Sequence, residues 1–244
     1  MDSNQVLRVV IANAKGGSGK TTMATNLVSA YCAKGVSTAL FDFDLQGSSM
    51  AWLGLRSSDL PEIHGVPAYR MEHGGATRSW ALRVPPEVQR VVVDTPAGLS
   101  GAALRDQLKG AQVVLVPVLP CSIDMLAAAE FIKELQTYMR TSGQALRIGL
   151  IANRVKKNTK VLTALHQFLA EFNVPVVAQV RDVQSYVACA EQGVGVAELK
   201  APRIKEEHKV WRQIYEWVET GQLDEQPADV SSGVLSKLTS FGFK

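Results

Sequence analysis

The chain has 244 residues, and 46% of them are hydrophobic, so it is long enough to bury one substantial core and is expected to form one α/β domain, or one domain with a tail. The net charge of only +3 excludes a polyanion-binding field over the whole molecule, and any nucleic-acid site would have to be a local patch. No apolar run approaches the roughly 18 residues of a membrane-spanning helix, and the N-terminus does not read as a signal peptide, so we expect a cytoplasmic protein.

Apolar runs rich in β-branched residues alternate with amphipathic segments along the chain. The runs predict strands at residues 7–12, 38–43, 91–93, 113–118, 148–152 and 176–180. The amphipathic segments predict helices at residues 21–34, 123–140, 160–172 and 206–219. Most of the strands lack an alternation of apolar and polar residues, as is typical of strands covered on both faces. We therefore predict a doubly wound, mostly parallel sheet flanked by helices.

Two stretches depart from this alternation. Residues 45–88 are irregular and are interpreted as a long excursion between two core strands. From Gly221 onward the chain becomes polar, and it ends with apolar residues at positions 234, 235, 238 and 241, which lie on one face of a short helix. The predicted division is a core domain at 1–220 and a polar linker with a short amphipathic tail at 221–244.

A glycine-rich loop follows the first predicted strand and reads AKGGSGKTT from residue 14 to residue 22. Its glycines let backbone N–H groups curl around an anion, Lys20 supplies a charge for phosphates, and the Thr21 hydroxyl is placed to bind Mg²⁺. The generic pattern G-x-x-x-x-G-K-[ST] fails at its first position, which is Ala14. Instead the loop carries a second lysine, Lys15, at its front.

Acidic residues follow two other predicted strands, as Asp42-Phe43-Asp44 and as Asp94-Thr95-Pro96-Ala97-Gly98. Loops at the carboxyl ends of parallel strands share one crevice, so we expect these carboxylates beside the glycine-rich loop, where Asp94 could hold Mg²⁺ directly or through water. Taken singly, Asp94 could instead cap a helix, and Asp42 and Asp44 could be solvated turn residues. The turn at 96–98 is a candidate switch that senses the γ-phosphate.

These motifs resemble the ParA/MinD family of deviant Walker A P-loop ATPases, over roughly residues 6 to 219. The resemblance implies a P-loop NTPase fold of the SIMIBI type, ATP and Mg²⁺ as cofactors, slow partner-stimulated hydrolysis and an ATP-dependent homodimer. It implies that Lys15 reaches the partner subunit's phosphates, that Gly17 permits the close approach, and that Asp44 positions the attacking water. The implied nucleotide-binding residues are Gly16, Gly17, Ser18, Gly19, Lys20, Thr21, Thr22 and Asn153, the last against adenine. The implied metal residues are Thr21, Asp44 and Asp94.

Members of this family differ in the surface that the ATP-bound dimer binds. Many ParA-like proteins bind non-specific DNA through basic residues, and this chain offers two groups: Arg154, Lys156, Lys157 and Lys160, and Lys200, Arg203, Lys205, Lys209 and Arg212. The expected function is therefore nucleoid-associated positioning of a cargo such as a plasmid, chromosome origin, carboxysome or chemotaxis cluster, with a cargo-associated protein stimulating hydrolysis. The second group also fits a solvated helix face, with Trp211, Ile214, Trp217 and Val218 in the core.

Two alternatives remain open. A MinD-like protein would bind the membrane through its tail, but the apolar face at 234–241 is short and carries little positive charge. An ATP-dependent amide ligase of the same fold would need an acid-binding site, which residues 45–88 could hold. Iron–sulfur relatives are disfavoured because the three cysteines lie far apart and are interpreted as buried thiols. Tyrosine kinases of this fold end in a tyrosine cluster, which this chain lacks.

Overall fold

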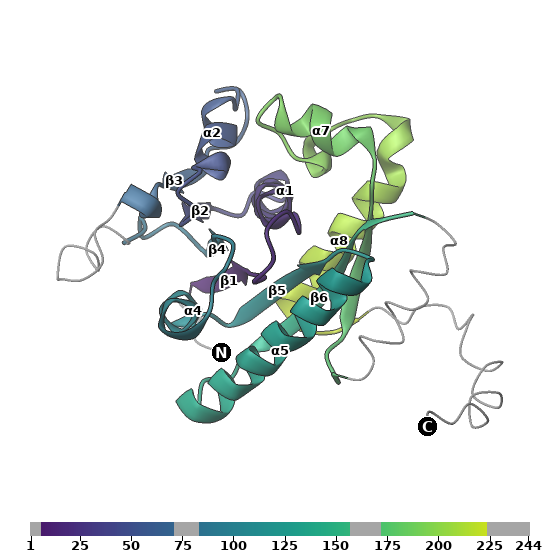
Figure 1. Cartoon of the computed structure of the whole chain (residues 1–244). Coiled ribbons are helices and arrows are strands. Elements are labelled where there is room, and N and C mark those ends of the chain that lie inside the picture. The colour runs from purple at the N-terminus through teal and green to yellow at the C-terminus, as the bar shows by residue number, and fades with distance from the viewer. Residues whose placement is uncertain (1–5, 71–82, 157–171, 224–244) are drawn as a thin grey trace.

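The computed structural model describes residues 6–70, 83–156 and 172–223. Its seven strands form one sheet in the order β3-β2-β4-β1-β5-β6-β7, and each neighbouring pair is parallel. The strands are β1 (Leu7–Ile11), β2 (Thr38–Asp42), β3 (His64–Val66), β4 (Arg90–Asp94), β5 (Val113–Val118), β6 (Arg147–Val155) and β7 (Val176–Arg181). Figure 1 shows this sheet with β1 near its middle.

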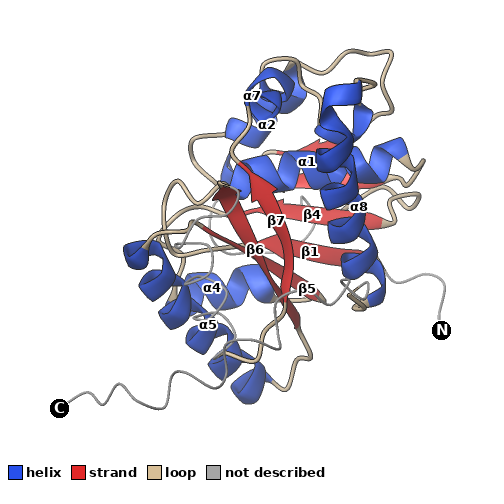
Figure 2. Ribbon diagram, turned by 90° about the vertical axis from the view of Figure 1, so that its right-hand side faces the viewer, coloured by secondary structure: helices blue, strands red, loops and turns tan. Residues whose placement is uncertain are grey.

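Helices cover both faces of the sheet (Figure 2). The described helices are α1 (Lys20–Ala33), α2 (Ser48–Gly54), α4 (Gly101–Leu108), α5 (Ser122–Ser142), α7 (Gln184–Ala190) and α8 (Lys205–Thr220), with 3₁₀ turns η1 (Ala68–Arg70), η2 (Val196–Glu198) and η3 (Pro202–Ile204). One apolar cluster joins the sheet to α4 and α5, and a second joins it to α1, α2 and α8. The predicted doubly wound fold is confirmed.

Strand β1 shows why the core strands carry no alternation of apolar and polar residues. Val10 packs in the cluster under α4 and α5, whereas Val9 and Ile11 pack in the cluster under α1 and α8, and all three are fully buried. Successive side chains of a strand point to opposite faces, so a sheet covered on both faces needs an apolar residue at every position. The continuous run of apolar residues is the signature of that double burial.

The excursion predicted at 45–88 contains more structure than its sequence indicates. It holds α2, the edge strand β3 and η1, while residues 71–82 lie outside the described part of the chain. Strand β3 is only His64–Val66, and it joins the sheet by pairing with β2, from Ala39 to Phe41. Three residues carry too little periodicity to predict a strand. The sequence also did not predict α2, α4 and α7, because helices of seven or eight residues show too little periodicity.

The C-terminal side of the fold ends at a clear helix stop. Helix α8 ends at Thr220, and Gly221 caps it in the left-handed conformation with φ of 75°. The domain boundary expected at residue 220 stays a prediction, because the tail from residue 224 lies outside the described residues, as does most of the helix expected at 160–172. Among residues 6–70, 83–156 and 172–223, no helix combines the length and apolarity needed to cross a bilayer.

Candidate nucleotide-binding site

The glycine-rich loop joins the carboxyl end of β1 to the start of α1. Gly17 and Gly19 have φ of 74° and 96°, in the left-handed region that glycine adopts without strain. Gly19 caps α1, no side chain caps the helix, and its first turn carries no acidic residue. The N–H groups at the start of this 14-residue helix therefore have no side-chain cap, and they favour an anion because the helix dipole is positive there.

Two buried asparagines from outside the loop hold its shape. Asn13 donates from Nδ2 to the Pro117 carbonyl (2.7 Å) and accepts the Lys15 N–H at Oδ1 (3.0 Å). Asn153, at the end of β6, donates from Nδ2 to the Ser18 carbonyl (2.7 Å). Its Oδ1 accepts the N–H of Arg154 at 2.9 Å. The placement brings Asn153 to the loop as expected, whereas contact with adenine stays a prediction.

The two loop lysines occupy different environments. Lys20 is buried, and its Nζ donates to the Lys15 carbonyl at 3.2 Å. Burial lowers the pKa of the Lys20 ammonium, and the negative charges of Asp94 and Asp44 partly oppose that shift. Lys15 is only partly buried, and the neighbouring Gly16 and Gly17 are exposed. Lys20 therefore faces the acidic side of the site, while Lys15 lies on the side open to solvent.

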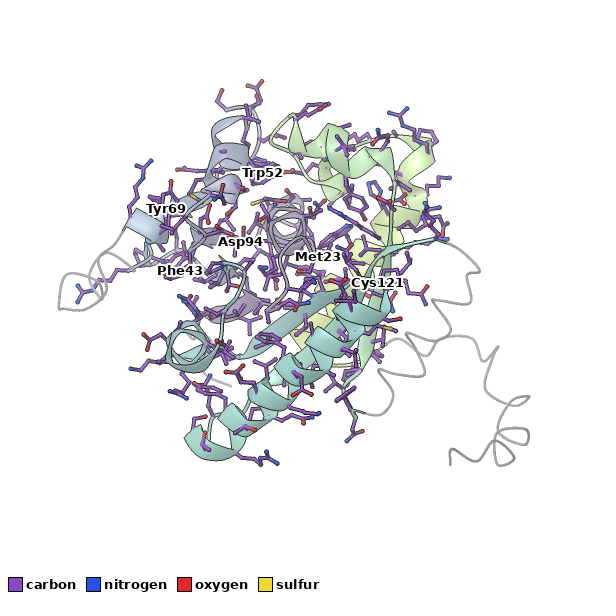
Figure 3. The ribbon with its side chains drawn as sticks, in the orientation of Figure 1. Met23, Phe43, Trp52, Tyr69, Asp94 and Cys121 are labelled. Atoms are coloured by element: carbon purple, nitrogen blue, oxygen red, sulfur yellow. The ribbon has the colours of Figure 1, made fainter. Side chains whose placement is uncertain are left out.

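Asp94 ends β4 in the interior of the molecule (Figure 3). It is 1% exposed, and neither carboxylate oxygen accepts a well-aligned hydrogen bond. Burial, together with the charge of Asp42, raises the pKa of Asp94 to about 7, although the hydroxyls of Thr21 and Ser49 and the charge of Lys20 act in the opposite direction. A buried carboxylate without a well-aligned donor is costly in a folded protein, and a bound cation would offset that cost.

Asp42 and Asp44 have separate tasks. Asp42 is fully buried and accepts the N–H groups of Asp44 (3.0 Å) and Met50 (3.1 Å), so it holds the turn and the start of α2. The interpretation of Asp42 as a solvated turn residue is therefore wrong. Asp44 is half-buried, and one of its oxygens accepts the Gln46 N–H at 3.0 Å in a local turn. Asp44 lies near enough to Lys20 to influence its charge.

The segment after Asp94 is bonded to the glycine-rich loop and to the strand before it. Thr95 is fully buried and donates from its hydroxyl to the Ile11 carbonyl at 2.8 Å. Gly98, with φ of 72°, donates its N–H to the Ala14 carbonyl at 2.8 Å. The candidate switch at 96–98 is therefore tied directly to the loop, so a displacement of one would move the other.

The site has the chemistry that a magnesium–nucleotide complex requires. Mg²⁺ prefers oxygen ligands, and it is usually held by one or two carboxylates together with substrate phosphates. The buried oxygens of Asp94 and the Ser18 hydroxyl lack partners, and the Thr21 hydroxyl lies by Asp94. No group of three or more His, Cys, Asp or Glu residues able to hold a metal occurs in the described part of the chain. A metal at this site would therefore rely on phosphate oxygens beside Thr21, Asp94 and Asp44.

All three cysteines are free thiols in the structure. Cys32 and Cys189 are buried, and burial raises the pKa of each thiol to about 11, which keeps both protonated near neutral pH. Cys121 is exposed, so the expectation that all three are buried thiols is wrong for this residue. It is the N-cap residue of α5, in the segment between β5 and that helix.

Comparison with known proteins assigns the fold and the loop to one family. Residues 9–196 match the model of the "CobQ/CobB/MinD/ParA nucleotide binding domain". The chain is 29% identical over 202 residues to a "Maintenance of carboxysome distribution protein A" of Halothiobacillus neapolitanus, a match that covers 82% of this chain and 91% of the relative.

Solved structures agree with this match. The structure of apo McdA from Cyanothece superposes with a TM-score of 0.68 at 16% identity and covers 85% of this chain and 98% of that one. MinD of Aquifex aeolicus gives a TM-score of 0.67 at 17% identity and covers 86% and 98% of the two chains. With the family model spanning most of the chain and the motifs gathered at one site, the protein belongs to the CobQ/CobB/MinD/ParA nucleotide-binding family and is an ATPase of its ParA/MinD branch.

Proposed function

We propose that this chain is a positioning ATPase that forms a dimer around ATP, binds nucleoid DNA without sequence preference, and is released when a cargo-associated protein stimulates hydrolysis. One observation carries the proposal: the glycine-rich loop has a buried lysine facing the acidic residues and a second, partly exposed lysine at its front. A single subunit needs only the first of these for its own phosphates. We assign the second lysine to the phosphates of a partner subunit.

The residue roles in this proposal are those that the family resemblance implies, and the burial and charge of the residues support them. Lys20 and the N–H groups of the loop bind the phosphates, Thr21 and Asp94 bind the metal, and Asp44 holds the attacking water. Lys15 reaches into the partner subunit, with exposed Gly16 and Gly17 leaving room for the two chains to approach. A cation supplied from another subunit stabilises the charge of the transferring phosphoryl group, as an arginine finger does. Hydrolysis would then report that the dimer has assembled.

The proposed DNA surface lies around the ends of β6 and β7 and the start of α8. Arg154 and Lys156 are exposed at the end of β6, where Val155 pairs with Arg181 of β7. Arg181 in turn forms an ion pair with Glu207 in the first turn of α8. The exposed residues of the second basic group are Lys200, Arg203, Lys205, Lys209 and Arg212. Lys157 and Lys160 lie outside the described residues.

The acidic residues between these basic side chains reduce the positive charge of the surface less than their number suggests. Glu207 is 3% exposed and paired with Arg181, so it presents almost no charge to solvent. Glu206 pairs with Lys209 at 3.2 Å, which leaves Lys200, Arg203 and Lys205 as the basic cluster at the helix start. On the inner face of α8, Trp211, Ile214, Trp217 and Val218 are buried, which confirms their expected place in the core.

The membrane-binding and ligase alternatives predict different experimental outcomes. The membrane-binding alternative depends on residues 234–241, which lie outside the described part of the chain. The ligase alternative shares the fold, so the fold cannot separate it from positioning. The relative from Halothiobacillus neapolitanus, which matches over most of both chains, is named for carboxysome distribution, and this favours a protein assembly as the cargo.

The test is the location of a fluorescent fusion of the full chain, compared with a chain ending at Gly221 and with a triple Ala variant of Lys200, Arg203 and Lys205. We expect a nucleoid signal that survives truncation and is lost in the triple variant. The matched control replaces Arg105 and Lys109, which are exposed on and just after α4, and should keep the signal. A membrane signal lost on truncation would support the MinD-like alternative, and diffuse signal in every form would support a ligase.

Binding to purified duplex DNA gives a second measurement. With ATP, affinity should fall steeply as salt rises, because each phosphate contact releases counterions. The triple variant should show a shallower dependence on salt than the wild type.

A further inference from the structure

Besides the Ser18 hydroxyl in the loop, three further buried oxygen atoms of the site lack hydrogen-bond partners, and two residues carry them. They are the two carboxylate oxygens of Asp94 and the hydroxyl oxygen of Ser49. Ser49 is fully buried in α2, and Asp94 is 1% exposed at the end of β4. Leaving a buried hydroxyl and a buried carboxylate unpaired is costly, and the residues are complementary, since one donates and the other accepts.

The position of Ser49 is fixed by its neighbours in the fold. Met50, the residue that follows Ser49, donates its backbone N–H to the Asp42 carboxylate at 3.1 Å. This hydrogen bond anchors the start of α2 at the end of β2. Asp42 and Asp94 are Cα partners in adjacent strands, so the same anchor sets α2 against Asp94. The Ser49 hydroxyl is also among the groups that lower the pKa of Asp94, in agreement with this placement of the two residues.

Asp94 also needs such a partner for electrostatic reasons. The charge of Asp42 on the adjacent strand disfavours a second anion, and burial adds to the cost. Asp42 accepts two backbone N–H groups, whereas neither carboxylate oxygen of Asp94 accepts a well-aligned hydrogen bond. Ser49 and Thr21 are the hydroxyl groups near Asp94, and Thr21 sits at the first turn of α1, on the phosphate side.

We propose that Ser49 is a positioning residue for Asp94: its hydroxyl donates to one carboxylate oxygen and leaves the other to face the metal beside Thr21. Partners of this kind orient metal-binding carboxylates, and their loss typically weakens metal affinity by a factor of about 10–100. The inference rests on the proposed role of Asp94 in binding Mg²⁺. It adds α2 to the site, because the helix that follows the Asp44 turn then contacts the metal-binding residue directly.

The experiment measures metal affinity and needs no turnover. Mn²⁺ binding to the ADP complex is followed by electron paramagnetic resonance for the wild type and for Ser49→Ala. We expect Mn²⁺ affinity to fall roughly tenfold in the variant, while ADP affinity in EDTA stays unchanged. Ser49→Thr, which keeps the hydroxyl, should restore most of the affinity. Ser29→Ala is the control, since Ser29 is equally buried but donates to the Thr25 carbonyl inside α1.

A double-mutant cycle separates this inference from the proposed role of Asp94. In an Asp94→Asn background, Ser49→Ala should cost no further Mn²⁺ affinity. An equal loss in both backgrounds, or no loss in the wild type, would overturn the positioning role of Ser49. If Asp94→Asn alone leaves Mn²⁺ affinity unchanged, the assignment of Asp94 to the metal fails instead.

Discussion

The side-chain amide of Asn153 donates a hydrogen bond of 2.7 Å to the carbonyl oxygen of Ser18, across 135 positions of sequence. The contact joins the end of β6 to the middle of the phosphate loop, and both residues are buried. A Cβ added to Gly19 would collide with the same amide nitrogen. The loop conformation therefore depends on Asn153. Asn153 has this structural role whether or not it also contacts the adenine base.

Asn153→Ala should weaken the binding of ATP and of inorganic tripolyphosphate alike, because it leaves the Ser18 carbonyl without its donor and loosens the loop. An unpaired buried carbonyl costs about 1–3 kcal/mol, which corresponds to roughly a tenfold loss of affinity or more. Affinities for both ligands are measured by calorimetry. Gln136→Ala is the control, since Gln136 also donates to a backbone carbonyl, that of Phe172, away from the loop. A loss for ATP alone would show that Asn153 acts only through adenine.

Gly17→Ala and Gly35→Ala form a matched pair. The two glycines have φ of 74° and 72°, and an added Cβ would meet no atom within 4 Å at either position. Each substitution should therefore cost a similar backbone strain, about 1 kcal/mol, in the free energy of unfolding measured with urea. Only Gly17→Ala should impair ATP-dependent dimerisation, because only Gly17 lies on the face proposed to meet a partner. If both variants dimerise normally, the close approach at Gly17 is wrong.

Lys15→Ala should leave ATP binding to the monomer nearly intact and reduce hydrolysis by a factor on the order of 10²–10³, since the developing charge would lose a preorganised cation. Hydrolysis is measured by phosphate release over a range of protein concentrations, and dimerisation by analytical ultracentrifugation with ATP. Lys109→Ala, which removes an exposed cation after α4, is the control. Normal dimerisation and hydrolysis in Lys15→Ala would refute the action of this lysine across the dimer.

Asp44→Ala should slow hydrolysis by a factor of about 10²–10⁴ while ATP and DNA binding persist, because the water loses its positioning group. The variant is expected to accumulate in the ATP-bound dimer, so its nucleoid signal should be stronger than that of the wild type. Single-turnover hydrolysis and ATP affinity are measured together. A variant that loses ATP binding instead would place Asp44 in nucleotide binding and not in the hydrolytic step.

A pH-dependent contribution to stability comes from Glu219, far from the site. Glu219 accepts from Arg90 at 2.8 and 2.7 Å and from the Tyr31 hydroxyl at 2.8 Å. Burial alone would raise the pKa of Glu219, but these hydrogen bonds outweigh it, and the pKa lies below its ordinary value. The stabilisation is therefore fully present above the unfolded pKa of about 4.3 and is lost as pH falls through the lower folded value.

Glu219→Gln should lower the free energy of unfolding by about 1–3 kcal/mol at pH 7, and the difference from wild type should shrink as pH falls below about 4. Urea unfolding at a series of pH values measures both quantities. Glu206→Gln is the control, because its pair with Lys209 is mostly exposed and should contribute less than about 1 kcal/mol. A difference between Glu219→Gln and the wild type that is independent of pH would show that packing, and not charge, explains the effect.

Local chemistry was enough to predict most of the fold core. Strands β1, β2, β4, β5, β6 and β7 and helices α1, α5 and α8 were predicted within a few residues, because apolar runs and helical periodicity mark elements that bury a face. The phosphate loop was also predicted from the sequence, since the glycines, lysine and threonine that would bind phosphate and Mg²⁺ lie close together along the chain. The short elements β3, α2, α4 and α7 escaped prediction, because their stability comes from tertiary contacts and not from their own pattern.

The sequence by itself therefore determined the parallel sheet, the phosphate loop and the acidic residues that end β2 and β4. Only the tertiary structure decided that Asn13 and Asn153 hold the loop, that Asp42 is a buried anchor, and that Ser49 faces Asp94. The physical reason is distance along the chain. Asn13 and Pro117 are 104 positions apart, and their hydrogen bond exists because β1 and β5 are neighbours in the sheet. Motifs are local in sequence, but the partners that orient them are chosen by the order of the strands.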